Sequence, residues 1–216
     1  MTSNKKYQVI LASGSPRRKE LLSWLDIAFE IISSDIEEIT EKIIPSEVAE
    51  DLAALKGRDV YSKLDKDKYK NPLIIASDTI VTLGDKIYGK PKNKDHAREM
   101  ILELENKTHE VVTSIYMLRV DIETHEVVEK VFSISSKVHF EKIDEDILDR
   151  YIESGESLDK AGSYGIQGQG LAFISNLNGS YSNVVGLPLS DFHREFKKFL
   201  GFEKSVKGEW RNVLSE

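Results

Sequence analysis

The segment LASGSPRRKELL (Leu11–Leu22) decides how the N-terminal part of this chain folds. The apolar residues Val9–Leu11 predict a short strand, and Pro16 fits the first position of the helix that follows. Gly14 lets the backbone turn tightly and approach a ligand closely. Ser15 is expected to cap the helix through its side-chain oxygen. A strand that delivers a helix N-terminus in this way favours the binding of an anion.

Two arginines, Arg17 and Arg18, fall in the first turn of this helix. A cation there is unfavourable by about 0.3–1 kcal/mol unless an anion compensates it. The planar guanidinium fork suits phosphate oxygens, which supports a phosphate site. The alternative is a capped amphipathic helix whose arginines pair with surface carboxylates, and the segment alone leaves both interpretations open.

The composition of the chain limits the classes of protein to which it can belong. With 216 residues, 40% hydrophobic and 31% charged, the chain is expected to form one globular domain over 1–202, followed by a tail at 203–216 to which we assign no role. No stretch approaches the roughly 18 apolar residues of a membrane span, and the N-terminal MTSNKK lacks a signal core, so a cytoplasmic location is expected. The absence of cysteine excludes disulfides and thiolate chemistry. A net charge of −7 disfavours a nucleic-acid-coating surface.

Apolar periodicity predicts an α/β protein. The predicted strands are Val9–Leu11, Phe29–Ser33, Leu73–Ala76 and Leu171–Ile174, the predicted helices are Pro16–Leu25, Pro45–Lys63, Lys94–Glu105, Glu145–Glu153 and Ser190–Leu200, and a long antiparallel hairpin is predicted over His109–Phe140.

Three carboxylates are candidates for chemistry. Asp78 is expected just beyond the end of a buried strand, where open α/β sheets bind ligands, and could act as a general base or hold a hard cation. Glu37 and Glu38 lie in a loop after another predicted strand. The alternatives are a turn aspartate and a solvated acidic loop. The five histidines lack zinc-site spacing, so a zinc hydrolase is not expected.

Three longer polar side chains stand in defined contexts. Lys90 lies between a glycine and a proline, which hold its backbone in place. Lys56 lies on an amphipathic helix, where an exposed lysine is the alternative. Gln167, in a glycine-rich segment, can both donate and accept hydrogen bonds as base recognition requires, although it could equally be a structural loop residue.

Taken together, eight colinear segments resemble the Maf family of nucleoside triphosphate pyrophosphatases. They are SGSPRRKELL (Ser13–Leu22), SDIEE (Ser34–Glu38), LAALK (Leu52–Lys56), SDTIV (Ser77–Val81), GKP (Gly89–Pro91), THEVVT (Thr108–Thr113), LDKAGSYGIQG (Leu158–Gly168) and GSYSNVVGLP (Gly179–Pro188). Small departures from the family pattern are Ser77, Gly57 and the run Gly168–Gly170.

The resemblance implies a mixed, strongly twisted sheet flanked by helices, with a cleft between two lobes, related to inosine triphosphate pyrophosphatases. It implies hydrolysis of a nucleoside triphosphate to monophosphate and pyrophosphate with a divalent cation (Mg²⁺, Mn²⁺ or Co²⁺). Arg17, Thr79 and Gln167 match a branch that acts on dTTP and UTP. Activity on 7-methyl-GTP or other modified nucleotides, and a non-catalytic nucleotide-binding regulator of cell division, remain the alternatives.

The resemblance and the residues together suggest the following roles. Asp78 is the expected general base and a metal ligand, and Glu37 is the second metal ligand. The residues expected to bind substrate are Ser13, Ser15, Arg17, Arg18, Lys56, Thr79, Lys90 and Gln167. The expected partner is the nucleotide, assembly with a second copy of the chain stays open, and neither nucleic acid nor a membrane is expected.

Overall fold

The computed structural model describes residues 6–205 and 207–215, so most of the N-terminal MTSNKK segment lies outside the described residues. Its strands are β1 (Gln8–Leu11), β2 (Glu30–Ile31), β3 (Pro72–Leu83), β4 (Lys86–Tyr88), β5 (Thr108–Val120), β6 (Val127–Phe140) and β7 (Ile174–Asn178). Its α-helices are α1 (Pro16–Ser23), α2 (Pro45–Lys63), α3 (Lys94–Leu104), α4 (Glu145–Ser154), α5 (Tyr181–Val185) and α6 (Leu189–Phe199). The described residues also form four short 3-10 helices, η1 (Glu156–Asp159), η2 (Ala161–Ser163), η3 (Gln169–Phe173) and η4 (Glu209–Val213).

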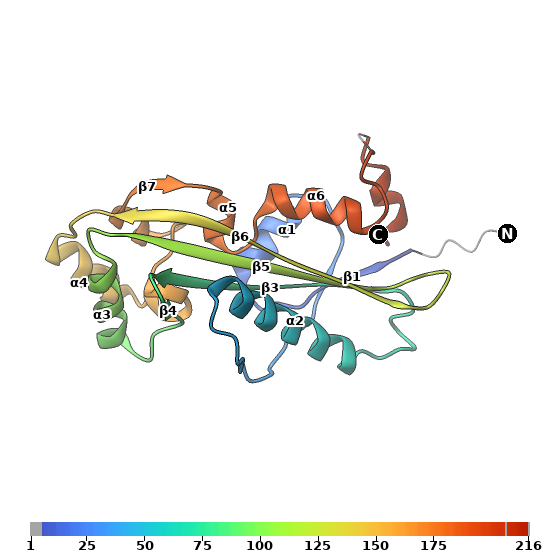
Figure 1. The fold of residues 1–216 in the computed structure, drawn as a ribbon, viewed down its shortest axis with the longest axis horizontal. Helices are drawn as coiled ribbons and strands as arrows, with labels where there is room; N and C mark the ends of the chain where they lie inside the picture. The colour runs from blue at the N-terminus through green and yellow to red at the C-terminus, as the bar shows by residue number, and fades with distance from the viewer. Residues whose placement is uncertain (1–5, 206, 216) are drawn as a thin grey trace. The chain divides into compact units, whose positions relative to one another are not determined.

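The strands form one mixed sheet in the order β2-β1-β3-β5-β6-β7, with β4 paired to β3 (Figure 1). Strand β1 runs parallel to β2 and β3, whereas the pairs β3–β4 and β6–β7 are antiparallel. The α/β class with a mixed sheet flanked by helices, predicted from the sequence, is therefore confirmed. Within the described residues, no helix has the length and apolar character needed to span a membrane.

The chain divides into two compact units. The first comprises Met1–Asp78, Ser114–Ser133 and Leu189–Glu216, and the second comprises Thr79–Thr113 and Ile134–Pro188. The boundaries fall inside the long strands β3, β5 and β6. The predicted single domain over 1–202 and the predicted cleft stay predictions.

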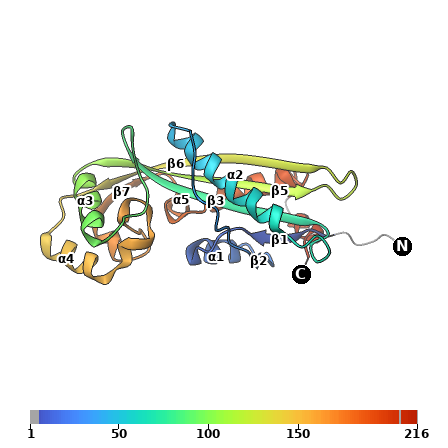
Figure 2. The same ribbon diagram turned by 90° about the horizontal axis from the view of Figure 1, so that it is seen from below.

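In the first unit, helix α2 covers one face of the sheet. Its residues Ala53, Ala54 and Val60 pack against Ile10, Ile74, Ala76, Tyr116 and Leu118. Helices α1 and α6 lie on the opposite face, as Figures 1 and 2 show. This two-sided cover explains why β1 and the start of β3 are continuous apolar runs, because both faces of these strands are buried.

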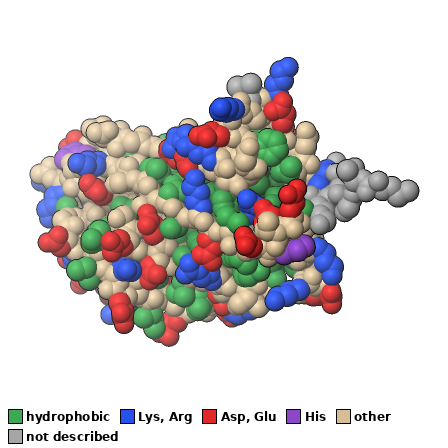
Figure 3. Space-filling view, turned by 45° about the vertical axis from the view of Figure 1, so that its right-hand side comes forward, with side chains coloured by type: hydrophobic (Ala, Val, Ile, Leu, Met, Phe, Trp, Pro, Cys, Tyr) green, Lys and Arg blue, Asp and Glu red, His purple; other side chains and the backbone are tan. Residues whose placement is uncertain are grey.

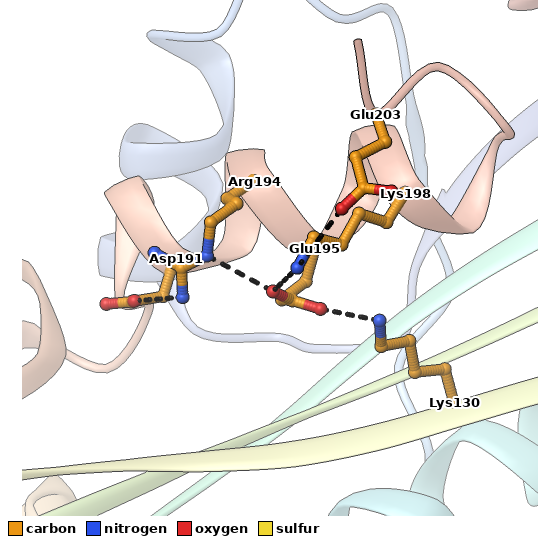
Figure 4. A network of polar contacts seen from close by, with 6 residues as sticks. All are labelled: Lys130, Asp191, Arg194, Glu195, Lys198 and Glu203. Carbon is orange, nitrogen blue, oxygen red and sulfur yellow. Dashed lines mark hydrogen bonds and ion pairs between the residues drawn. The ribbon is translucent and has the colours of Figure 1, made fainter.

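Helix α6 and the segment after it are held to the first unit by packing and charge. Glu195 lies among the cations Lys130, Arg194 and Lys198 (Figure 4). The hydrogen bond from Lys130, above all, lowers the pKa of Glu195 to about 2. Trp210 of the tail is 1% exposed and packs edge-on against Phe196. The part of the tail that is described is therefore ordered against α6.

The second unit has its own core, built by α3, α4 and the inner faces of the strands. Phe140 is the centre of an aromatic cluster with His109, Tyr164 and Phe173, all arranged edge to face. Such aromatic pairs contribute about 0.5–1.5 kcal/mol each beyond the area that they bury. The cluster joins strand β5 to the glycine-rich segment that carries Gln167.

Two predicted boundaries were wrong in ways that matter for the site. Strand β3 continues to Leu83, so Asp78 lies within a strand and not after one. Its parallel neighbour β1 ends at the pair Leu11↔Ile75, three residues before Asp78, and β3 continues into a hairpin with β4. The predicted strand Leu171–Ile174 is mostly the 3-10 helix η3, and strand β7 begins at Ile174. In both cases tertiary pairing, which a local apolar run does not encode, sets the boundary.

Candidate active site

Lys56 lies between two carboxylates in the first unit. Its Nζ is 2.6 Å from Asp78 Oδ1 and 2.9 Å from Glu38 Oε1. Asp78 is 6% exposed, and the Lys56 side chain is 15% exposed. The exposed, solvated lysine considered for this position is therefore wrong, because Lys56 falls in the apolar register of α2 between Leu52 and Val60. A cation in this register is available to neutralise charge at a partly buried site.

The acidic loop is held along α2 by hydrogen bonds. Ser34 Oγ donates to Asp59 Oδ2 at 2.7 Å, and Thr40 Oγ1 donates to Asp51 Oδ2 at 2.6 Å. Because Asp51 and Asp59 flank Lys56 on the helix, the loop runs past the lysine and presents Glu38 to it. Glu37, the metal ligand expected from the sequence, is exposed in the same loop.

The turn after β1 contributes a second cation. Ser13 is 8% exposed, and its Oγ accepts hydrogen bonds from Arg18 Nη1 and from the backbone N of Ser15, both at 3.3 Å. Burial lowers the pKa of the Arg18 guanidinium, whereas the negative charge of Asp78 raises it, Arg17 lowers it and Glu38 raises it. Arg18 thus shares an electrostatic environment with both carboxylates that bind Lys56.

The expected cap by Ser15 is wrong in its detail. Ser15 occupies the N-cap position of α1, but within the described residues its side chain makes no capping hydrogen bond. Its backbone carbonyl accepts from the N–H of Lys19 at 3.1 Å, which closes the first turn. Ser13 instead supplies the local hydroxyl contact, because its Oγ reaches both the Ser15 amide and Arg18. Arg17, the other arginine of this turn, is partly buried.

In the second unit, Thr79 is the one partly exposed residue in the otherwise buried run from Pro72 to Thr82. Its Oγ1 lies 3.0 Å from Thr113 Oγ1 on β5. Thr113 in turn donates to the backbone carbonyl of Asn183 in α5 at 2.8 Å. The hydroxyl of Thr79 is therefore attached to a buried hydrogen-bond chain.

The segment that carries Gln167 is anchored from inside. The buried Tyr164 hydroxyl lies 2.7 Å from His109 Nε2, and Glu156 Oε2 accepts from the N–H of Gln169 at 3.1 Å. A Cβ atom on Gly168 would lie 2.0 Å from Glu156 Oε1, so a larger residue there would displace the Glu156 carboxylate. With Tyr164 and Glu156 holding the inner side, Gln167 is exposed on the outer side.

Lys90 lies in the turn after β4 and is also exposed. The carbonyl of the preceding Gly89 accepts a hydrogen bond from the N–H of Gly162 at 3.1 Å. Gly162 has a φ of +66°, and a Cβ there would lie 2.9 Å from Val81 Cγ2. The turn that carries Lys90 is therefore bonded directly to the glycine-rich segment that carries Gln167.

The two carboxylates on Lys56 fit a hard divalent cation that also takes oxygens from a substrate. Mg²⁺ is commonly held by one or two carboxylates plus phosphate oxygens and water. Among the described residues, no three His, Cys, Asp or Glu side chains gather as a complete metal cage. The donor set therefore suits a cation shared with a bound phosphate chain and not a metal enclosed by protein alone.

The sequence reasoning assigned no role to Thr113 or Asn183 and preferred Glu37 to Glu38. Both Thr113 and Asn183 lie in segments that carry the family resemblance, and the signal that could have singled them out is a polar residue inside an apolar strand or short helix. Which of the two adjacent glutamates contacts Lys56 depends on the conformation of an irregular loop. Such a loop has no periodic sequence pattern from which the contact could be predicted.

The sequence was also compared with known proteins. A family model described as "Maf-like protein" matches residues 8–199. A dTTP/UTP pyrophosphatase of Lachnoclostridium phytofermentans is 42% identical over 193 residues, 89% of this chain and 95% of the relative. Proteins with the same name from Alkaliphilus metalliredigens and Ruminiclostridium cellulolyticum are each 43% identical, covering 84% and 92% of this chain and 91% and 98% of the relatives.

Proposed function

This chain belongs to the Maf family, and from that premise we propose that it hydrolyses a pyrimidine nucleoside triphosphate, dTTP or UTP, to the monophosphate and pyrophosphate. The names of relatives that align with nearly their whole length support this activity. The structural observation that carries the proposal is the Asp78–Lys56–Glu38 cluster. It places a buried carboxylate, which can accept a proton from water, beside a cation, which can neutralise phosphate oxygens. Clearance of non-standard nucleotides is the cellular role that this reaction would serve.

The proposed chemistry starts at Asp78. A water molecule attacks the α-phosphorus, its proton passes to the Asp78 carboxylate, and the bond to the bridging oxygen breaks so that pyrophosphate leaves. Lys56 binds Oδ1, and we assign Oδ2 to the attacking water. Holding the water and the phosphorus in line lowers the barrier by pre-organisation, and general base catalysis contributes about 10²–10⁴-fold.

The cations of the site neutralise the charge that spreads over the phosphate oxygens. Lys56 and Arg18 are assigned this role, and Lys90 is a further candidate. Ser13 orients Arg18 through its hydroxyl, and Ser15 belongs to the same turn. A divalent cation, when bound, would neutralise phosphate charge. Asp78 and Glu38 are the residues that would hold it, with Glu37 as the second candidate beside them.

We assign recognition of the nucleobase to Arg17, Thr79 and Gln167. Thr79 and Gln167 offer a hydroxyl and an amide, which together can match the hydrogen-bonding edge of uracil or thymine. The non-catalytic regulator is disfavoured because the carboxylates that a hydrolase needs are present and paired. A nucleic-acid-binding role is disfavoured by the net charge of −7 and by the mixture of acidic and basic side chains on the face in Figure 3.

A pyrophosphate-release screen tests the proposal directly. The purified chain is offered the common nucleoside triphosphates, 7-methyl-GTP and other methylated nucleotides, each with Mg²⁺, Mn²⁺ or Co²⁺. We expect dTTP and UTP to give the highest kcat/KM and to yield monophosphate and pyrophosphate in equal amounts. Release of orthophosphate in place of pyrophosphate, or a clear preference for 7-methyl-GTP, would contradict the proposal.

A further inference from the structure

The carboxyl group of Glu156 packs against the inner side of the glycine-rich segment that carries Gln167. Its Oε2 accepts a hydrogen bond from the backbone N–H of Gln169 at 3.1 Å. A Cβ atom on Gly165 would lie 3.4 Å from Glu156 Oε1, and one on Gly168 would lie closer still. The carboxyl group is therefore in contact with the chain on both sides of Gln167, which is itself exposed.

Glu156 is fixed by its own backbone. It follows Gly155, which ends helix α4 with a φ of +73°. Its N–H donates to Ser154 Oγ at 3.2 Å, and its carbonyl accepts a hydrogen bond from Lys160 Nζ. The Lys160 side chain is 11% exposed, and a Cβ atom on Gly165 would lie 2.5 Å from its Cε. Glu156 is thus a fixed support and not a freely moving surface glutamate.

The lack of a side chain at position 168 is explained by this carboxyl group and not by the backbone. Gly168 has a φ of −121°, which lies outside the left-handed region that favours glycine. The three atoms nearest to a Cβ there would all belong to the carboxyl group of Glu156, at 2.0, 2.5 and 2.6 Å. A side chain at position 168 and the carboxyl group of Glu156 therefore compete for the same space.

We infer that Glu156 is a positioning residue for base selection, because it fills the inner side of the turn and holds the backbone that carries Gln167. The inference rests on the proposed function, in which Gln167 faces the base. At the same place on the ring, uracil and thymine present an accepting oxygen and cytosine presents a donating amino group. A fixed backbone limits how the Gln167 amide approaches that atom, whereas a loose turn allows the amide to adapt to either base.

The test is the ratio of kcat/KM for UTP to that for CTP. Glu156→Ala removes the support, and we expect the ratio to fall by at least about fivefold, but no further than in Gln167→Ala. Glu156→Gln fills the same space and can accept from the N–H of Gln169, so it should retain the wild-type ratio. Gly168→Ala displaces the carboxyl group and should lower the ratio as Glu156→Ala does. The two alanine substitutions combined should lower it no further than either alone.

A second background separates positioning from a general structural role. If Glu156 acts through Gln167, then Glu156→Ala should leave the ratio of Gln167→Ala unchanged. A purely structural role would instead lower the activities on UTP and CTP together and leave the ratio of the wild type as it is. Glu153→Ala is the matched control, because Glu153 is an exposed glutamate of α4 that pairs with Lys94. It should keep the wild-type ratio.

Should Glu156→Ala fail to fold, Gly168→Ala tests the same point, because it moves the carboxyl group without removing it. A ratio that falls in Gln167→Ala but is unchanged in the folded Glu156 or Gly168 variant overturns this inference alone. A wild-type enzyme that does not cleave UTP overturns the proposed function instead.

Discussion

Lys56 Nζ lies 2.6 Å from Asp78 Oδ1, although the two residues are 22 positions apart, and the same ammonium lies 2.9 Å from Glu38 Oε1. One cation therefore bridges a helix, a strand and a loop. The arrangement holds the Asp78 carboxylate in place, because the ammonium of Lys56 binds its Oδ1. It also gives Lys56 a second partner when the first is lost.

Asp78→Asn is expected to lower kcat by about 10²–10⁴-fold while the chain stays folded. The amide is nearly the same shape as the carboxylate but cannot take a proton from water, and Lys56 retains its ion pair with Glu38. Pyrophosphate release and a thermal melt measure the two effects. Asp85→Asn, an exposed aspartate in the turn after β3, is the control and should be fully active. More than about a tenth of wild-type kcat in Asp78→Asn would exclude Asp78 as the base.

Removal of divalent cations with EDTA is expected to abolish turnover, and Mg²⁺ or Mn²⁺ should restore it. Two single variants identify the second ligand, Glu38→Gln and Glu37→Gln. Because Glu38 shares Lys56 with Asp78, we expect Glu38→Gln to raise the Mg²⁺ concentration for half-maximal activity by at least about tenfold and Glu37→Gln to change it little. The opposite ranking would return the role to Glu37, and full turnover in excess chelator would show that no metal is needed.

Gly57→Ala is expected to destabilise the chain even though alanine is the better helix former. A Cβ atom at position 57 would lie 2.3 Å from Cδ1 of the buried Tyr116 ring, which cannot move aside in a packed core. Overpacking typically costs about 1–3 kcal/mol, against up to about 1 kcal/mol gained from helix propensity. Chemical denaturation measures the net loss. Gly57→Ala should cost less stability in a Tyr116→Val background than in the wild type, and equal costs in the two backgrounds would show that the ring is not the obstacle.

The Gly57–Tyr116 pair also shows what the sequence can and cannot reveal. Helix α2 was predicted with its correct ends, because Pro45 and the apolar spacing are local signals. Gly57 stood out from the sequence as a departure from the family pattern, but its cause is a ring on β5, 59 residues away. Such compensation between distant positions leaves no trace in one sequence without its structure.

The same distinction applies to the site. Asp78, Lys56 and Arg18 were identified as candidates from their segments, and the structure brings them into one electrostatic environment. The contacts between side chains were not predicted, namely the ion pair of Glu38 with Lys56 and the hydrogen bond between Thr79 and Thr113. Residue type and spacing indicate which chemistry is available. Pairing across strands and loops decides which groups meet, and it depends on the tertiary fold.

His109 should make the stability of the chain depend on pH between about 6.5 and 4. Burial, and to a smaller extent His139, lowers the pKa of His109 to about 4 from an ordinary 6.5. The unfolded chain therefore binds this proton first as pH falls, so stability is full above pH 6.5 and is lost progressively down to about pH 4. The lost contribution is of the order of 3 kcal/mol.

Denaturation curves of wild type and His109→Gln across this range isolate the effect. Glutamine can still hydrogen-bond the Tyr164 hydroxyl but does not titrate, so the variant should show a shallower pH dependence between 6.5 and 4. His125→Gln, in the exposed turn between β5 and β6, should leave the wild-type pH dependence unchanged. If the free energy of unfolding fell equally steeply with pH in wild type and in His109→Gln, the protonation of His109 would not be the cause of the pH dependence.

Gln167→Ala is expected to narrow the preference for UTP over CTP. The Gln167 amide can donate to O4 of uracil or thymine, whereas cytosine presents an N4 amino group there and forces the amide to flip. A polar group left unpaired costs about 1–3 kcal/mol, or roughly 5–150-fold in kcat/KM, and that discrimination should be lost with the amide.

Gln169→Ala, an exposed amide two residues further along, is the control and should keep the wild-type ratio. Because Gln167 is remote in the chain from the Asp78–Lys56 pair, the requirement for a divalent cation should be the same in both variants. An unchanged UTP-to-CTP ratio in Gln167→Ala would remove this residue from base recognition and leave Thr79 and Arg17 to provide it.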